Sequence, residues 1–254
     1  MSGGSATSML TMSGVTKRYG ETLALSDADV AFAKGHVHTI LGENGSGKST
    51  LVKLLSGVVR PTAGDIRLDD RPITLARPVD AHHLGISTVF QEVLLAPERS
   101  VIENIFMGFD GLFTFRLGKS ERREKAASVL SSVTRTSLDL EQPAGQVPLA
   151  QQQLIVLARS LVRNPRILIL DEVTAALDFG DRDVLFKAIR DFVESGRLAI
   201  FISHRMDEVR RLSDRVTVLR SGKVVETLEA GQITGPRLLS LMLPDTRIPI
   251  GHHL

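Results

Sequence analysis

The sequence predicts an α/β fold with a mostly parallel central sheet, and three observations support this prediction. Residues 37–41 are β-forming and are followed by a glycine-rich loop and then by a helical pattern. Residues 167–170 form a short apolar run, which is typical of a strand buried on both faces of a parallel sheet. Residues 196–203 contain a similar apolar run. Buried strands that alternate with helical segments favour the α/β class.

The glycine-rich loop has the sequence of a phosphate-binding loop. It matches the pattern G-x-x-x-x-G-K-[ST], in which glycines let backbone N–H groups turn inward around a β-phosphate. Side chains at those positions would obstruct the approach. We expect the whole loop to bind nucleotide: Gly42, Glu43, Asn44, Gly45, Ser46, Gly47, Lys48, Ser49 and Thr50.

Two side chains of this loop carry the expected chemistry. Lys48 reaches toward the β- and γ-phosphate oxygens as a point charge, and Ser49 offers a hydroxyl ligand to Mg²⁺. Thr50 continues into a helix, whose apolar residues recur at helical spacing: Leu51, Leu54, Leu55 and Val58. Because the strand, loop and helix follow one another as a phosphate-binding loop requires, ATP or GTP is the expected ligand.

Composition excludes several classes of protein. The 254 residues suit one large domain, and 24% charged with 43% hydrophobic residues is ordinary for a globular chain. A net charge of +2 gives no field that favours nucleic acid, so we expect no nucleic-acid partner. The absence of cysteine excludes disulfides and thiolate metal sites. No apolar run approaches the ~20 residues that cross a bilayer, so any membrane contact is expected through a partner.

Two carboxylates follow the apolar run at residues 167–170. At the carboxyl end of a buried strand, Asp171 is placed to join the Mg²⁺ shell, which it would contact through a water molecule. Glu172 is placed to accept a proton from the water that attacks the γ-phosphate. The alternative is a solvated acidic strand end without chemistry.

Two further polar residues follow predicted strands. His204 comes where the run in residues 196–203 stops, and ligands of α/β sheets lie beyond the carboxyl ends of strands, so His204 can touch the γ-phosphate and the water. Gln91 follows residues 86–90 and can bind Mg²⁺ or the water through its amide oxygen. Either residue alone could equally be an ordinary surface or capping residue.

The segment from 98 to 163 is helical in character. Its last helix begins after Pro148 and stops at Asn164-Pro165, since proline cannot continue a helix. We expect a flexible tail at residues 1–9, which lack the apolar stretch of a secretory signal, and a linker-like tail at residues 244–254.

The motifs, and the order in which they follow one another along the chain, resemble those of an ATP-binding cassette (ABC) nucleotide-binding domain. The resemblance covers residues 10–243, and the spacing from Gln151 to Asp171, an offset of 20 positions, matches that of the family. It rests on the loop at Gly42, on the segments 150–152 and 175–178, and on four residues: Gln91, Asp171, Glu172 and His204.

The resemblance implies a P-loop NTPase core with a mostly parallel sheet. It also implies an antiparallel β subdomain at the N-terminal side and an inserted α-helical subdomain at about residues 98–163. ATP and Mg²⁺ would be the cofactors. Tyr19 would stack on the adenine, unless it only packs in a strand. Asp178 would lie across the seam of a head-to-tail pair of cassettes, each ATP being held between the two.

The chain is most similar to the N-terminal cassette of tandem ATPases of monosaccharide importers, of the ribose, galactose and xylose type. Segments 90–92, 101–108 and 150–153 carry this likeness. It implies an ATP-hydrolysing subunit that powers import of a small solute, expected to be a sugar. The implied partners are membrane-spanning permease subunits, a second cassette and, indirectly, a solute-binding protein. The expected location is the cytoplasmic face of the cell membrane, as a peripheral subunit.

One segment departs from the family pattern. Where the signature reads Leu-Ser-x-Ala-Gln, residues 147–151 read Val-Pro-Leu-Ala-Gln. Pro148 lacks both the hydroxyl and the N–H that would donate to the opposite γ-phosphate. We therefore hypothesise an asymmetric pair in which another cassette supplies the working signature. The alternative is a homodimer that tolerates the proline.

Two rival functions stay open, and a third is discounted. A soluble cassette ATPase acting on ribosomes or DNA usually carries paired cassettes, long insertions or basic extensions, which this sequence lacks. A regulatory module that does not hydrolyse ATP would explain Pro148. A small-molecule kinase would not explain the spacing between Gln151 and Asp171.

Overall fold

A computed structural model describes residues 8–109 and 117–243. Most of the expected N-terminal tail, residues 1–7, and the expected linker at residues 244–254 lie outside the described residues. The first strand, β1 (Ser8–Tyr19), already includes residues 8 and 9. Among the helices of the described residues, none is both long and apolar enough to cross a bilayer.

The central element is a six-stranded, mostly parallel sheet. The strands lie in the order β10 (Lys223–Glu229), β9 (Arg215–Arg220), β3 (Val37–Leu41), β8 (Leu198–Ile202), β7 (Ile167–Asp171) and β6 (Ile86–Val89). The pairs β3–β8, β3–β9, β7–β8 and β6–β7 are parallel, and only the edge pair β9–β10 is antiparallel. Every residue of β3, β7 and β8 is buried, as the apolar runs of β7 and β8 predict. In β3 the buried residues include the polar His38 and Thr39.

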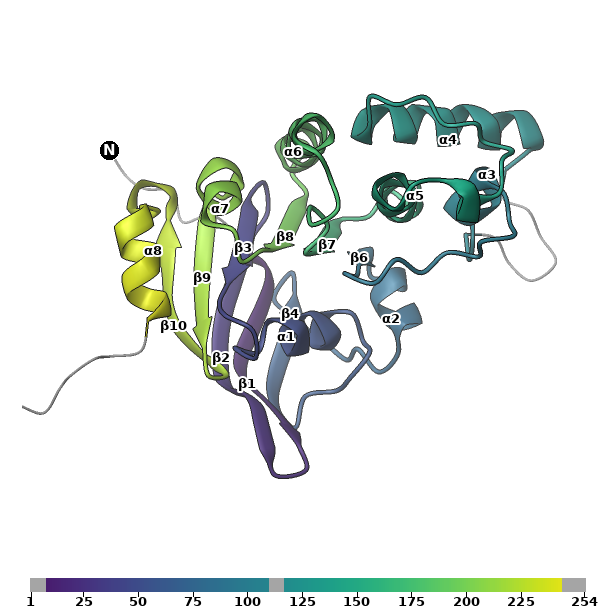
Figure 1. The fold of residues 1–254 in the computed structure, drawn as a ribbon. Helices are drawn as coiled ribbons and strands as arrows, with labels where there is room; N and C mark the ends of the chain where they lie inside the picture. The colour runs from purple at the N-terminus through teal and green to yellow at the C-terminus, as the bar shows by residue number, and fades with distance from the viewer. Residues whose placement is uncertain (1–7, 110–116, 244–254) are drawn as a thin grey trace, which may run out of the picture.

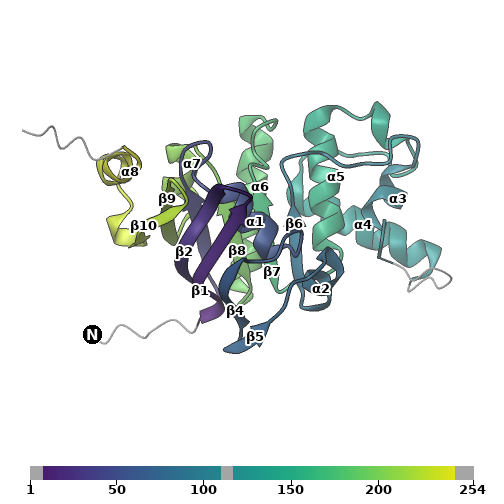
Figure 2. The same cartoon turned by 90° about the horizontal axis from the view of Figure 1, so that it is seen from below.

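A second sheet is antiparallel and comes mainly from the N-terminal part of the chain. Its order is β2 (Thr22–Ala33), β1, β4 (Ala63–Leu68) and β5 (Arg71–Ile73). Figures 1 and 2 show this sheet on one side of the central sheet, with α1 (Lys48–Leu55) between them. The fold class expected from the sequence and the resemblance, a parallel core with an antiparallel β subdomain, is thus confirmed.

Helices cover the other face and both ends of the central sheet. In Figure 1, α6 (Phe179–Glu194) and α7 (Met206–Leu212) lie on the face opposite α1, and α8 (Gly235–Met242) lies beside β9 and β10. At the far end, α3 (Val101–Ile105), α4 (Lys119–Val133) and α5 (Leu149–Leu161) gather into a helical part with its own buried cluster. The remaining short elements are α2 (Pro78–His83), η1 (Ala144–Gln146) and η2 (Ala230–Gln232).

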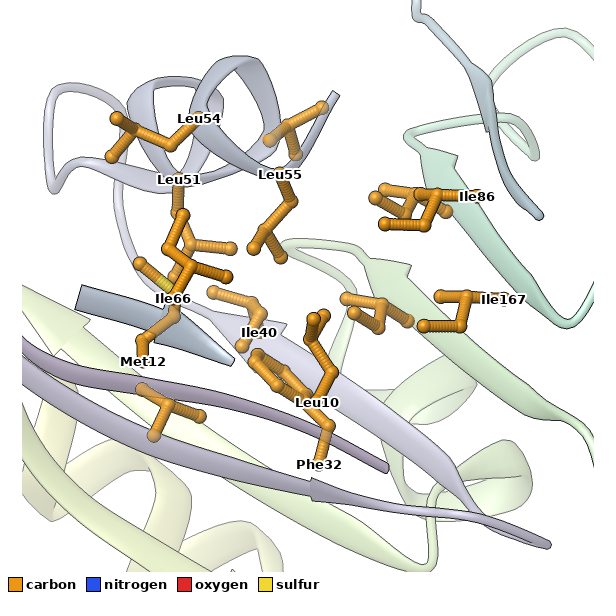
Figure 3. Packing of buried hydrophobic residues seen from close by; sticks show 14 of the residues in the cluster. Leu10, Met12, Phe32, Ile40, Leu51, Leu54, Leu55, Ile66, Ile86 and Ile167 are labelled. Atoms are coloured by element: carbon orange, nitrogen blue, oxygen red, sulfur yellow. The ribbon is translucent and has the colours of Figure 1, made fainter. Parts of the chain in front are cut away.

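The largest core surrounds α1. The leucines of this helix are buried between the two sheets, so burial of its apolar face fixes the direction in which the preceding loop points. Figure 3 shows the packing of Leu51, Leu54 and Leu55 with Leu10, Met12, Phe32, Ile40, Ile66, Ile86 and Ile167.

The helix after the loop is shorter than its apolar spacing predicts. We expected Val58 on the same helical face as Leu55, but α1 ends at Leu55 and Val58 is exposed. Gly57 takes a positive φ of 69° there, and a Cβ at Gly57 would contact the carbonyl of Arg77. The backbone turns away at this glycine, because the left-handed conformation ends the helix.

Candidate functional site

The predicted phosphate-binding loop joins the end of β3 to the start of α1. Gly47, the N-cap of α1, has φ 107°, and a Cβ there would lie 2.8 Å from the carbonyl oxygen of Ala24 in β2. A Cβ at Gly42 would collide with the carbonyl oxygen of Leu219 and the hydroxyl of Ser46. The loop therefore needs glycine at both predicted positions, because neighbouring backbone occupies the space of a side chain.

Lys48 curls back over this loop. Its Nζ donates hydrogen bonds to the carbonyl oxygens of Gly42 at 2.7 Å and of Glu43 at 2.9 Å. Burial lowers the pKa of Lys48, although Glu172, Asp171 and Glu43 act in the opposite direction. The ammonium is thus held at the loop and partly desolvated, which suits attraction of an anionic group.

The two predicted carboxylates lie side by side at the end of β7. Asp171 is its last residue and is buried, and this burial together with the negative charge of Glu172 raises the pKa of Asp171 to about 6. Lys48 and Lys53 act in the opposite direction. A carboxyl group in this position gains from any bound cation that offsets its desolvation.

Glu172 and His204 contact each other. His204 Nδ1 donates to Glu172 Oε1 at 3.2 Å, since a carboxylate oxygen only accepts. Glu172 has a positive φ of 49°, which is uncommon for a residue with a side chain, and its N–H donates to the carbonyl of Ile202 in β8 at 3.1 Å. Such backbone strain gathers at functional sites.

A cleft of ≈ 640 Å³ brings most of the predicted site together. Its predicted lining residues come from five separate parts of the chain: Tyr19, Asn44, Gly45, Gly47, Lys48, Ser49, Thr50, Gln91, Glu172 and His204. Four predicted residues do not line it. Gly42 and Asp171 are buried, and Glu43 and Ser46 line a smaller hollow of ≈ 90 Å³ that also includes Arg220.

Sequence reasoning missed one wall of the cleft. Thr22, Leu23 and Ala24 at the start of β2 line it together with the loop. They follow the tight turn after Tyr19, a residue that is 42% exposed and whose ring centroid lies 5.0 Å from Lys17 Nζ. The turn residues Gly20 and Glu21 signal a hairpin, and β1 pairs with β2 there. From this hairpin signal, the sequence could have predicted that residues 22–24 lie beside Tyr19.

The donor set fits a hard cation. Ser49, Gln91 and Asp171 offer hydroxyl, amide and carboxylate oxygens, the atoms that Mg²⁺ prefers. Among residues 8–109 and 117–243, no three His, Cys, Asp or Glu side chains form a metal-binding group. A cation here would thus complete its shell with phosphate oxygens and water, as magnesium does in nucleotide sites.

The segment around Pro148 stands apart from this cleft. Pro148 is the N-cap of α5 without a side-chain cap, and Leu149 beside it is 60% exposed. Asp178 caps α6 by accepting a hydrogen bond from the Asp181 N–H at 2.8 Å. The next residue, Phe179, is 81% exposed. Two large apolar side chains at helix starts thus face solvent.

A family model described as ABC transporter matches residues 25–175. The chain is 40% identical over 235 residues to a ribose import ATP-binding protein of Rhizobium etli, covering 91% of this chain and 45% of that protein. It is 39% identical over 248 residues to a putative ribose/galactose/methyl galactoside import ATP-binding protein of Burkholderia cenocepacia. This match covers 95% of this chain and 48% of that protein. The chain therefore spans about half the length of these relatives.

Solved structures of cassettes share the fold. The dimeric structure of MJ0796, a bacterial ABC transporter cassette, superposes with a TM-score of 0.79 at 26% identity, covering 87% of this chain and 99% of that one. A structure of the same cassette in a post-hydrolysis state bound to ADP and Pi gives a TM-score of 0.78 at 25% identity, with the same coverage.

Proposed function

Because the chain belongs to the ABC transporter family, we propose that it binds ATP with Mg²⁺ in the cleft and hydrolyses it to power import of a small solute. The observation that carries this proposal is the single cleft that joins Lys48, Glu172 and His204. A phosphate loop, a strand-end carboxylate and a polar partner are the parts that nucleotide hydrolysis requires.

Binding is the task of the loop and of Tyr19. The inward-facing backbone of residues 42–47 and the ammonium of Lys48 hold the phosphates, and the exposed ring of Tyr19 offers a face for the adenine. Mg²⁺, when bound, neutralises charge on the β- and γ-phosphate oxygens, and Ser49, Gln91 and Asp171 would hold it.

Hydrolysis is the task of Glu172 and His204. Glu172 accepts a proton from the water that attacks the γ-phosphorus, as the bond from that phosphorus to the β–γ bridging oxygen breaks; ADP leaves with the bridging oxygen, and phosphate is the second product. His204, bonded to Glu172 at 3.2 Å, keeps that carboxylate oriented and lies beside the same cleft. The desolvated ammonium of Lys48 stabilises the negative charge on the transferring group.

We propose a sugar as the solute and membrane-spanning permease subunits as partners. The relatives named for ribose and galactose import support this assignment. A solute-binding protein would act upstream, and the chain would work as a peripheral subunit at the cytoplasmic face of the membrane. ATP would favour the closed pair of cassettes over the open one, and hydrolysis would reset the pair.

The second cassette in this proposal is a different one. At the start of α5, Pro148 removes the hydroxyl and the N–H that the family signature offers to a facing γ-phosphate, each bond being worth roughly 1.5–3 kcal/mol. The exposed side chains of Leu149 and Phe179 provide apolar surface for contact with the facing cassette. This chain would hydrolyse ATP at its own loop against an intact signature from its partner.

The test of the proposed function is Glu172→Gln. We expect phosphate release to fall by about 10² to 10⁴, because the general base is lost, while calorimetry still detects ATP binding. Glu226 is a surface carboxylate paired with Arg237, and Glu226→Gln is the matched control, which should retain the rate of phosphate release. Normal turnover by Glu172→Gln would remove this role, and absence of ATP uptake by the unsubstituted chain would remove the whole proposal.

A further inference from the structure

Glu208 is a buried carboxylate that the proposed mechanism does not use. It lies in α7, facing inward, and is only 1% exposed. Burying a carboxylate is costly unless hydrogen bonds and opposite charges compensate for the lost water. Its contacts therefore indicate what it contributes.

One carboxylate oxygen of Glu208 accepts hydrogen bonds from two hydroxyl groups. Oε2 accepts from Thr174 Oγ1 at 2.9 Å and from Ser203 Oγ at 2.8 Å. Both donors are buried, so water does not compete for them. Hydrogen bonds to a charged acceptor are stronger than neutral ones.

The two donors belong to the two loops that carry the candidate catalytic pair. Thr174 is two positions after Glu172, and Ser203 directly precedes His204. Ser203 Oγ also accepts from the Arg205 N–H at 3.0 Å, which fixes the backbone on the other side of His204. One carboxylate oxygen thus ties together the chain segments that follow β7 and β8.

Two arginines compensate the charge of the second oxygen. Arg182 Nε lies 3.6 Å and Arg205 NH1 3.5 Å from Glu208 Oε1. The side chain of Arg182 comes from α6 and is largely buried. The carboxylate is therefore enclosed by opposite charge from α6 and from the loop after β8.

We infer that Glu208 is a positioning residue, which holds the Glu172 loop and the His204 loop at the spacing that lets these two side chains meet. This inference rests on the proposed function in so far as Glu172 and His204 act in hydrolysis. Glu208 itself does not line the cleft. Its effect reaches the reaction through Thr174 and Ser203.

The variant that tests this role combines Thr174→Val with Ser203→Ala. It removes both hydroxyl donors and leaves Glu208 and its arginines in place. Thr174→Val alone is the milder form if the double variant folds poorly. The matched control is Thr217→Val in β9, which removes a buried hydroxyl that bonds His38 Nε2 at 2.7 Å and Thr227 Oγ1 at 2.8 Å, away from the cleft.

The first readout is single-turnover phosphate release alongside ATP affinity. We expect the rate to fall about 10- to 100-fold, because small displacements of reacting groups are costly, with ATP affinity unchanged. Thr217→Val should lose stability without losing rate. Equal rates for the double variant and the control would overturn the inference.

The second readout does not depend on hydrolysis. The ¹⁵N signals of His204, assigned by their loss in His204→Gln, report whether Nδ1 carries the proton and donates it. We expect one fixed tautomer in the unsubstituted chain and in Thr217→Val, and a mixture in the double variant. Unchanged His204 signals in the double variant would overturn the inference, whatever the rate. If the unsubstituted chain releases no phosphate, the proposed function fails while the His204 signals still decide this inference.

Discussion

Asp171 shows a conflict between stability and function at a single residue. Its pKa is raised to about 6 by burial and by Glu172, whereas an exposed aspartate titrates near 4. Between roughly pH 4 and pH 6 the folded chain therefore binds more protons than the unfolded chain, and its stability falls as pH rises through this window. Above that window the ionised Asp171 carries the full free-energy cost of its burial. A carboxylate with this cost is explained if a bound cation later compensates for it.

We predict that Asp171→Asn stabilises the chain when nucleotide and divalent cations are absent. At pH 8 the gain should be about 1–3 kcal/mol, because the amide avoids the cost of a buried charge. At pH 5 roughly half of this gain should remain, since the folded aspartate is then largely protonated. Denaturant unfolding in EDTA at the two pH values measures both quantities.

The control for this prediction is Asp207→Asn, which removes a carboxylate that is 74% exposed. It should change stability little at either pH. A destabilised Asp171→Asn at pH 8, or a gain that grows toward pH 5, would contradict the assignment of a desolvated carboxylate.

At the residue scale, sequence reasoning predicted which side chains lie together more readily than it predicted backbone conformation. Asp171, Glu172 and His204 follow apolar runs, and parallel strands end at one edge, so their proximity could be predicted. The positive φ of Glu172 could not, since no local pattern demands it. Glu208 was also missed, because its partners lie 34 and 5 positions away and only the packing of α7 brings them together.

At the scale of elements, the phosphate-binding loop is also a structural joint. The N–H of Gly222, in the turn between β9 and β10, donates to the Ser46 carbonyl at 3.0 Å. The Gly222 carbonyl in turn accepts from the Ser26 N–H of β2 at 2.7 Å. The loop therefore contacts both sheets, and its glycines serve close backbone approach as well as the ligand.

We predict that Gly47→Ala disrupts this joint. The added Cβ would lie 2.8 Å from the Ala24 carbonyl and would sit on a backbone with φ 107°, so both contact and conformation are unfavourable. We expect a loss of about 2–4 kcal/mol in the free energy of unfolding, together with loss of ATP binding. Chemical denaturation and calorimetry measure the two effects.

Gly235→Ala is the control for the loop substitution. Gly235 lies in α8 with no atom within 4 Å of an added Cβ, and alanine favours a helix. It should leave stability equal or higher and ATP binding unchanged. Tight ATP binding by Gly47→Ala would show that the joint tolerates a side chain.

Helices and strands were predicted well where the local sequence pattern determines them. They were predicted less well where contacts between distant segments determine them. The buried strands β7 and β8 follow from their apolar runs alone, and β3 follows from its β-forming residues before the glycine-rich loop. The antiparallel sheet was expected only from the family resemblance, since strand pairing depends on distant segments. The end of α1 was missed because Gly57 meets Arg77, a contact across 20 positions that the leucine spacing does not reveal.

At the scale of the whole molecule, the two halves of the proposed ATP site have different quality. The cleft lined by Lys48, Glu172 and His204 brings the loop and the strand-end residues together, whereas the start of α5 at Pro148 lacks the donors expected of a signature. A pair made of two identical chains would combine two good clefts with two poor signatures. A pair with an intact cassette would have one site in which both halves are good.

We predict that Pro148→Ser strengthens ATP-dependent self-association. In a Glu172→Gln background, which keeps ATP bound, the new hydroxyl and N–H restore donors toward the facing γ-phosphate at both sites of the pair. Each such bond contributes roughly 1.5–3 kcal/mol, so the dissociation constant of the dimer should fall by about tenfold or more. Sedimentation velocity with and without ATP measures it, and Pro72→Ser in the edge strand β5 is the control that should change nothing. If the chain with Pro148 already dimerises tightly with ATP, and serine adds nothing, the proline is tolerated and the pair is symmetric.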